Sequence, residues 1–264
     1  MRPMIRRLTA ATLLLGASGL LAACGTTGHS TTVTVARAAS TAAGTATGAA
    51  NASPSGGLAK PLTRHQAIVF AHAVNLTPAD VPGFTVTPRE PETAVGKGLE
   101  REMVSCAGAL SSNEKLVEVS SEKFQRGHEM PEVDVSSEVS FARTPALAIR
   151  ELEALRSAQA RACVSRYIDR YFKGEEFRGA SISPVTITSS TPSAPGTTGS
   201  FGWQISLTIT ARRVQIPFYI DILGFVYGQA QVSLFSTGVP APLPSGIQQR
   251  LFSLLLERAK AHRL

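Results

Sequence analysis

The sequence lacks most of the residue patterns that mark catalytic or nucleic-acid-binding proteins. It has no Gly-x-Ser-x-Gly, no His-Glu-x-x-His and, beyond its first 60 residues, no glycine-rich phosphate loop. No basic run with interleaved aromatic residues occurs, so the usual mark of nucleic-acid binding is missing. The three cysteines form no Cys-x-x-Cys pair, and no histidine stands at ligand spacing from them. These absences lower the expectation of an enzyme without excluding one.

Two residue pairs remain as candidates for chemistry. Ser112 and Lys115 have the Ser-x-x-Lys spacing, in which a lysine one helical turn away can activate a serine. The partner motifs Ser-Asp-Asn and Lys-Thr-Gly are missing, so we interpret this stretch as a solvated loop. His65 and His72 stand seven positions apart on one predicted helix, about 10 Å along its axis, which is too far to share a metal ion. We therefore predict no catalytic residue, no metal and no cofactor.

The start of the chain has the form of a secretory signal peptide. Three arginines precede an apolar run, 8–21, that is too short to span a bilayer as a stable helix. The run ends in Leu21-Ala22-Ala23-Cys24, which resembles the lipobox of bacterial lipoproteins. We predict that residues 1–23 are removed and that Cys24 is lipidated, with two or three acyl chains for durable anchoring at the outer face of the cytoplasmic membrane. An ordinary signal peptide and an uncleaved anchor are the alternatives.

Residues 24–60 are predicted to be a disordered tether. After Cys24 they are rich in Thr, Ala, Ser and Gly and contain no acidic or aromatic residue, so they cannot bury enough apolar surface to offset their ordering entropy. Their root-mean-square reach is on the order of 30 to 35 Å; a glycosylated stalk is the alternative. Five of the 26 basic residues precede residue 61, which leaves 21 basic against 19 acidic residues in the remainder. The net charge of +7 therefore falls to +2 for 61–264.

Residues 61–264 are predicted to form one α+β domain with three main helices. Capping-box patterns start a helix over 64–74 at Thr63 and a C-terminal helix at Ser245. Thr144-Pro145 starts, and Lys173-Gly174 ends, a long amphipathic helix. One stripe of that helix is expected to face a sheet; it comprises Ala148, Leu152, Leu155, Ala162 and Cys163.

Alternating apolar residues predict the strands of an antiparallel sheet. A rigid turn over 76–84 leads into a first strand, and in 201–210 one face is apolar and the other polar. We expect a single meander sheet of about six to seven strands, with the long helix and the C-terminal helix packed on one face. The other predicted strands are 116–124, 133–141, 182–188, 216–225 and 230–235.

Two cysteines remain once Cys24 is acylated. Cys106 and Cys163 form an even pair in an oxidising compartment, so a disulfide is the prediction and a redox or metal site the alternative. Cys163 lies on the apolar stripe of the long helix, so its side chain should face the sheet or the segment below it, where Cys106 can meet it. Cys106 lies in the segment 99–110, which has mixed helical character and few apolar anchors of its own.

Three stretches carry a resemblance to a known family: Ala79-Asp80-Val81-Pro82-Gly83-Phe84, the run from Phe141 to Ala148, and Gly224 to Phe235 with the helix after it. Together with the order of elements over 75–264, they resemble small actinobacterial lipoproteins and the extracellular sensor domains of PknH-type kinases. The resemblance implies an α+β sheet with a cleft, stapled by two disulfides. This chain differs in having one cysteine pair after Cys24 and no kinase domain.

We expect a non-catalytic ligand-binding or sensing module, tethered to the cell envelope by its lipid. Its partners would be the membrane and a small molecule, a lipid or an envelope protein, but no nucleic acid. A carrier of an apolar molecule is the alternative, with Trp203, Phe218 and Phe225 lining a cavity; a large apolar cavity would favour the carrier and a filled one the module. A cell-envelope enzyme is the second alternative.

Overall fold

The computed structural model describes residues 62–88, 94–127, 130–173 and 179–262. The predictions for 1–23, for the tether 24–60 and for lipidation of Cys24 lie outside these ranges. Within them, no helix combines the length and the hydrophobicity needed to cross a membrane.

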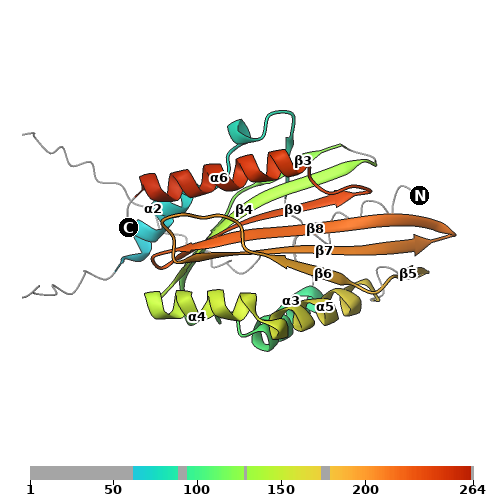
Figure 1. The fold of residues 1–264 in the computed structure, drawn as a ribbon, viewed down its shortest axis with the longest axis horizontal. Coiled ribbons are helices and arrows are strands. Elements are labelled where there is room, and N and C mark those ends of the chain that lie inside the picture. Colours follow the sequence, from blue (N-terminus) through green and yellow to red (C-terminus); the bar gives the residue numbers. More distant parts are fainter. Residues whose placement is uncertain (1–61, 89–93, 128–129, 174–178, 263–264) are drawn as a thin grey trace, which may run out of the picture. The chain divides into compact units, whose positions relative to one another are not determined.

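The described residues form a mixed α+β domain, as predicted, with one antiparallel nine-stranded sheet (Figure 1). The helices are α2 (Arg64–Val74), the 3-10 helix η2 (Pro78–Asp80), α3 (Ala94–Ala107), α4 (Pro145–Arg156), α5 (Ala158–Phe172) and α6 (Ser245–Ala261). The strands are β1 (Thr85–Thr87), β2 (Lys115–Ser120), β3 (Lys123–Arg126), β4 (Glu132–Ala142), β5 (Ala180–Ile182), β6 (Thr186–Ser190), β7 (Gly199–Ala211), β8 (Val214–Tyr227) and β9 (Ala230–Val239).

The sheet runs β1-β3-β4-β9-β8-β7-β5, with β2 also on β4 and β6 also on β7. Strands β7, β8 and β9 form a meander, but β9 returns to lie beside β4, so the whole sheet is not one meander. Nine strands replace the expected six to seven because two predicted strands are each interrupted by a serine. Ser121 and Ser183 accept hydrogen bonds with their side chains from the backbone N–H of Ser137 and Thr208, both at 2.9 Å, and Pro184 has no N–H to donate.

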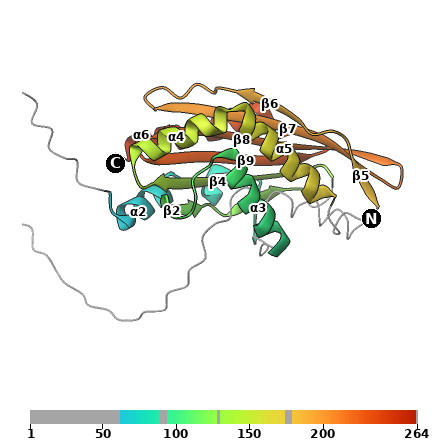
Figure 2. The ribbon, with the colours of Figure 1, turned by 90° about the horizontal axis from the view of Figure 1, so that it is seen from below.

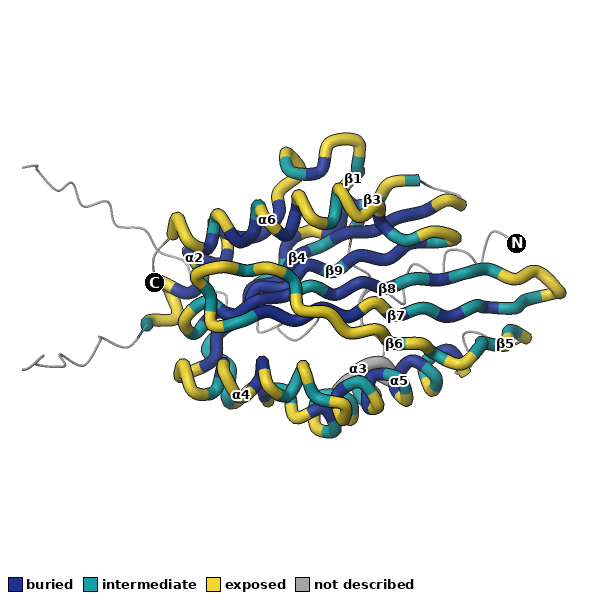
Figure 3. The backbone as a smooth tube through the Cα atoms, in the orientation of Figure 1, coloured by how far each residue is buried: buried dark blue, intermediate teal, exposed yellow. Residues whose placement is uncertain are grey.

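The helices cover both faces of the sheet, which corrects the expectation of one face. Helices α4 and α5 pack with the odd residues of β7 in one hydrophobic cluster. Helices α2 and α6 pack in a second cluster, with Val135, Val139 and Phe141 of β4. Figures 1 and 2 show the two groups of helices on opposite sides of the sheet, and Figure 3 shows the buried strand centres between them. The sheet therefore has two covered faces.

The predicted long helix is two helices that meet at Ser157. Ser157 has an extended backbone, ends α4 and caps α5 by accepting a hydrogen bond from the N–H of Ala160 at 3.0 Å. This competition between side chain and backbone is what favours serine at helix ends. The predicted stripe is buried at Ala148, Leu152 and Cys163, but Ala162 is exposed.

The ends of the other helices confirm one capping box and correct the other. Thr63 and Gln66 exchange the predicted hydrogen bonds at the start of α2. At α6 no side chain caps the first turn, and Pro244 precedes the helix. The side chain of Gln248 instead hydrogen-bonds the buried carboxyl of Asp221 on β8, whose pKa is raised by burial and only partly lowered by this contact.

An ion pair joins α6 to the turn after α2. Arg258 donates to both carboxylate oxygens of Asp80, at 2.8 and 2.7 Å, and to the carbonyl oxygen of Asn75 at 3.0 Å. Burial alone would raise the pKa of Asp80, but the hydrogen bonds from Arg258 and Thr77 outweigh it, so the pKa lies below its ordinary value. The ionised form of Asp80 is therefore the one that stabilises the fold.

We expect Asp80→Asn to lower the free energy of unfolding by about 1 to 2 kcal/mol at pH 7. Because the folded pKa is depressed, the stability that Asp80 contributes is present above the unfolded carboxyl pKa of about 4 and is lost as the pH falls through the folded value. The gap between wild type and variant in urea unfolding should accordingly close below about pH 4. Asp169→Asn, which removes an exposed pair with Lys173, is the control, and a gap that does not change with pH would contradict this account.

Candidate functional site

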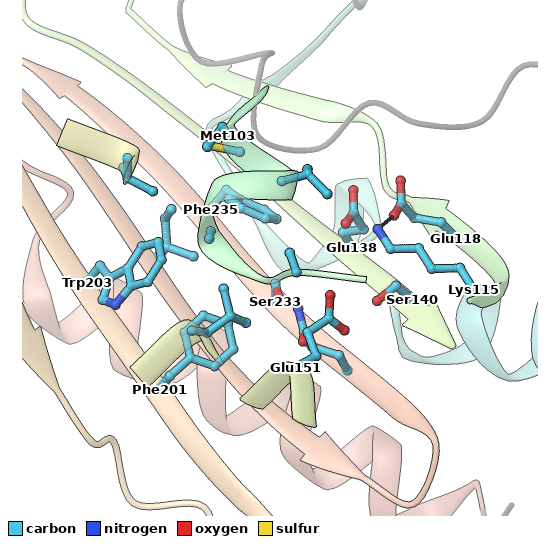
Figure 4. Close-up of a pocket in the computed structure, with 17 residues that line it drawn as sticks. Met103, Lys115, Glu118, Glu138, Ser140, Glu151, Phe201, Trp203, Ser233 and Phe235 are labelled. Carbon is cyan, nitrogen blue, oxygen red and sulfur yellow. Dashed lines mark hydrogen bonds and ion pairs between the residues drawn. The ribbon is translucent and has the colours of Figure 1, made fainter. Parts of the chain in front are cut away.

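A pocket of about 110 Å³ lies between the sheet and the helices α3, α4 and α5. The pocket lies on the face of the sheet that α4 and α5 cover, and its lining includes residues of β7, β8, β9 and β4. Figure 4 shows aromatic side chains on one side of the pocket and charged ones on the other. Its lining comprises Met103, Val104, Ala107, Ala109, Lys115, Glu118, Glu138, Ser140, Glu151, Leu155, Val164, Phe201, Trp203, Ile222, Gln231, Ser233 and Phe235.

The strand register explains why the pocket has two unlike sides. One row across the sheet runs Trp203, Ile222, Phe235 and Ser136 on β7, β8, β9 and β4. The next row runs Phe201, Gly224, Ser233, Glu138 and Ser120 on β7, β8, β9, β4 and β2. Each row is apolar at β7 and becomes polar toward β4. A ligand in the pocket would therefore meet both surfaces.

The polar side brings three carboxyl groups to one ammonium group. Lys115 Nζ lies 2.5 Å from Glu118 Oε2 (Figure 4), and Ser120 donates a hydrogen bond to Glu138 at 3.1 Å. Glu151 reaches the same side from α4. Among the lining residues that the structure describes, three carboxyl groups and one ammonium group therefore lie on this side.

Burial and the neighbouring charges shift the pKa values of Glu151 and Lys115. Burial raises the pKa of Glu151, and both the charge of Lys115 and a hydrogen bond from the N–H of Leu110 (3.2 Å) offset only part of this rise. Burial alone would lower the pKa of Lys115, but the charges of Glu118, Glu138 and Glu151 hold it above its ordinary value. Lys115 is therefore a fixed cation and not a general base at neutral pH.

The aromatic side depends on a glycine. Phe201 and Trp203 stand on β7 with their ring centroids 6.2 Å apart, and both are buried. The Phe201 ring lies against the backbone of Gly224 on the neighbouring strand, where a Cβ would come within 2.5 Å of Phe201 Cζ and 3.1 Å of the carbonyl oxygen of Val232. The missing side chain at Gly224 thus makes room for the Phe201 ring against the neighbouring strand.

We expect Gly224→Ala to push the Phe201 ring toward the pocket and to lower the free energy of unfolding by about 1 to 3 kcal/mol, as overpacked substitutions do. Because Trp203 is the single tryptophan of the chain, the displacement should also change its fluorescence emission. Gly246→Ala on α6, where a Cβ meets nothing within 4 Å, is the matched control. Unchanged stability and emission in Gly224→Ala would show that the ring does not depend on the glycine.

A disulfide holds the helix that closes one end of the pocket. Cys106 on α3 and Cys163 on α5 are bonded, with Cα atoms 5.8 Å apart, which confirms the predicted pairing. Gln159 donates to the carbonyl oxygen of Cys106 at 2.8 Å, and Arg166 contacts Cys106 Sγ at 2.9 Å. Met103, Val104 and Ala107 of the same helix line the pocket. The disulfide therefore fixes a wall of the site.

The two residue pairs considered as candidates for chemistry lie in different parts of the domain. Ser112 is exposed in a turn and is absent from the pocket lining, as expected of a solvated loop. The loop interpretation is wrong for Lys115, which begins β2 and lines the pocket. His65 and His72 are both exposed on α2, consistent with surface positions. In the described ranges no three His, Cys, Asp or Glu side chains form a group that could hold a metal ion.

The three aromatics proposed for a carrier cavity do not share one. Trp203 lines the pocket, but Phe218 packs against Phe172 in the core, with ring centroids 5.8 Å apart. Phe225 belongs to the cluster on the opposite face, where it packs on Phe252. The strand spacing places Phe225 on the other face because side chains alternate along β8.

Comparison with known proteins does not identify a ligand for the pocket. No family model matches the chain, and no curated protein matches it. Among solved structures, the extracellular domain of PknH from Mycobacterium tuberculosis is similar at a TM-score of 0.38 and 11% identity, over 76% of this chain and 98% of that one. At this level the similarity is distant and assigns neither ligand nor function.

Proposed function

We propose that this chain is a lipid-anchored extracytoplasmic module that binds a small molecule in the pocket without transforming it. The observation that carries the proposal is the pocket itself, which is apolar on one side and charged on the other and is closed by a disulfide-held helix. Its polar groups are engaged with one another, as in the Lys115 and Glu118 pair. A binding site needs this arrangement of few oriented polar groups in an apolar setting.

A carrier of lipid is less well supported. Pockets for drug-sized ligands typically measure about 300 to 1,000 Å³, whereas this one measures about 110 Å³ and has carboxyl groups in its wall. Acyl chains would gain nothing from Glu138 or Glu151. The size and lining therefore favour the sensing or accessory module over the carrier.

Native mass spectrometry of the membrane-extracted protein tests this function. We expect a small molecule to travel with the wild-type chain and to be lost from Ser233→Leu, which adds bulk at the centre of the pocket. Ser112→Ala, outside the pocket, is the control. A bound molecule that persists in Ser233→Leu would place binding elsewhere, and turnover of that molecule by the wild type would make the protein an enzyme.

A further inference from the structure

The disulfide between Cys106 and Cys163 lines a second cavity, of about 240 Å³, between α3 and α5. The other lining residues are Glu102, Met103, Arg166, Tyr167 and Arg170. We propose that this disulfide is a site of thiol–disulfide exchange, at which a small thiol that carries a carboxylate becomes covalently attached to Cys106. The site is distinct from the pocket beside Trp203, and its reactivity does not depend on the binding function proposed above.

Cys106 is the cysteine that an incoming thiol can reach. It is partly exposed, whereas Cys163 is 2% exposed. In disulfide exchange a thiolate attacks one sulfur while the other sulfur leaves, and access decides which sulfur is attacked. The difference in burial therefore directs the attack to Cys106 and makes Cys163 the leaving group.

Arg166 is placed to stabilise the thiolate that leaves. Its Nη2 atom lies 2.9 Å from Cys106 Sγ and 3.5 Å from Cys163 Sγ. A neutral sulfur is a weak hydrogen-bond acceptor, but a guanidinium beside a thiolate forms a charge-assisted hydrogen bond and favours the ionised form. The contact is therefore stronger once the S–S bond has begun to break than before, and an interaction of that kind speeds the reaction.

The step needs no oxidant or reductant other than the thiol itself. The incoming thiol loses its proton to water and its sulfur bonds to Cys106 Sγ, while the bond between Cys106 and Cys163 breaks with its electron pair on Cys163 Sγ. Arg166 and Cys163 stand three residues apart on α5, so the arginine stays beside this thiolate if α3 moves. Attack of the Cys163 thiolate on the mixed disulfide releases the small thiol and restores the bridge.

The charged residues of the cavity favour an acidic thiol. Of the three that line it, Glu102 and Arg170 form an ion pair with each other. The third, Arg166, is directed at the two sulfurs, which leaves a positive charge beside the reacting atoms. This charge attracts a thiol that carries a carboxylate and repels one that carries an ammonium group. A cavity of about 150 Å³ can hold benzene, so 240 Å³ admit a thiol of the size of an amino acid.

Three small thiols of different charge test the site. The membrane-extracted protein is treated under native conditions with mercaptoacetate, mercaptoethanol or cysteamine at equal thiolate concentration, and samples are quenched with excess maleimide for intact mass and peptide mapping. Each rate is divided by the rate of the same thiol with an uncharged small disulfide. We expect mercaptoacetate on Cys106 and maleimide on Cys163, at a relative rate about threefold above that of mercaptoethanol at low salt, with cysteamine slowest.

Variants test the part that Arg166 plays. Arg166→Gln should slow the labelling of Cys163 about five- to tenfold and should move the pH dependence of that labelling to higher pH, because the charge-assisted hydrogen bond is lost. Arg161→Gln removes the same charge from α5 at a position outside the cavity lining and should change neither. An arginine with a purely structural role would alter unfolding and leave the pH dependence where it is.

Other results would contradict the assignment at separate points. Attachment of the thiol to Cys163, with maleimide on Cys106, would reverse the attacked sulfur, and equal relative rates for the three thiols would exclude the acidic class. Wild-type rates in Arg166→Gln would remove the role of the arginine. Labelling that occurs only in denaturing urea would make the bridge purely structural and overturn the exchange site. None of these results bears on the ligand of the pocket beside Trp203, which native mass spectrometry tests.

Discussion

Reduction of the disulfide between Cys106 and Cys163 is expected to lower the melting temperature of the domain by about 8 to 16 °C. The bridge closes a loop of 57 residues, which corresponds to about 4 kcal/mol in the chain-entropy model, and a domain of this size loses about 2 to 4 °C per kcal/mol. This is the largest stability effect that we expect from any single bond in the chain.

The position of α3 gives this loss a structural basis. Two glycines, Gly96 and Gly98, lie within the helix, and each costs about 1 kcal/mol of helix stability relative to alanine. Beside the disulfide, the side-chain contacts between α3 and α5 include the hydrogen bond from Gln159, the contact of Arg166 with Cys106 Sγ, and an ion pair between Glu102 and Arg170. The ion pair is exposed and contributes little. We therefore expect α3 to loosen first on reduction and to open the pocket.

Differential scanning calorimetry with and without a thiol reductant measures the effect. The double variant Cys106→Ala and Cys163→Ala should melt near the reduced wild type and should not respond to the reductant. A wild-type melting temperature that stays constant, with free thiols demonstrated by labelling, would contradict the account of α3.

Substitution of the predicted lipidation site is expected to change where the protein is found. In Cys24→Ala nearly all of the chain should move from the membrane fraction to the soluble secreted fraction, because the tether 25–60 has no apolar run to hold it and stable anchoring needs two or more acyl chains. The control is Ser30→Ala, a tether substitution that leaves the cysteine in place.

Fractionation with a high-salt wash, followed by measurement of the intact mass, tests this prediction directly. The wild type should carry the mass of the chain from Cys24 plus its acyl groups. A Cys24→Ala chain that stays with washed membranes would make the lipoprotein interpretation wrong or incomplete.

The sequence predicts much of the architecture because its periodic patterns of apolar residues correspond to helices and strands of the structure. The helix 64–74 has the predicted bounds, and the strand predicted over 133–141 extends by one residue at each end. Three of the errors in the bounds of helices and strands are single-residue events. At Ser121, Ser157 and Ser183 a serine side chain takes over a backbone hydrogen bond, and no periodic pattern distinguishes such a serine from one that continues its element.

The pocket is harder to predict than the fold. Glu138 and Ser140 alternate with Val139 and Phe141 on β4, which is also the pattern of a strand with one face in water. Only the sheet order, with β9 returning beside β4, places these polar residues under α3 and α4. Glu151 sits among charged neighbours on an amphipathic helix, so its burial has no signal in the sequence. Of the three aromatic residues predicted to line a cavity, Trp203 lines the pocket.

A crystal structure of the membrane-extracted protein, determined without added ligand, tests the central claim most directly. The account predicts a small molecule in the pocket, between Trp203 and Glu138. A pocket filled by its own side chains, with the bound molecule on another surface, would contradict it.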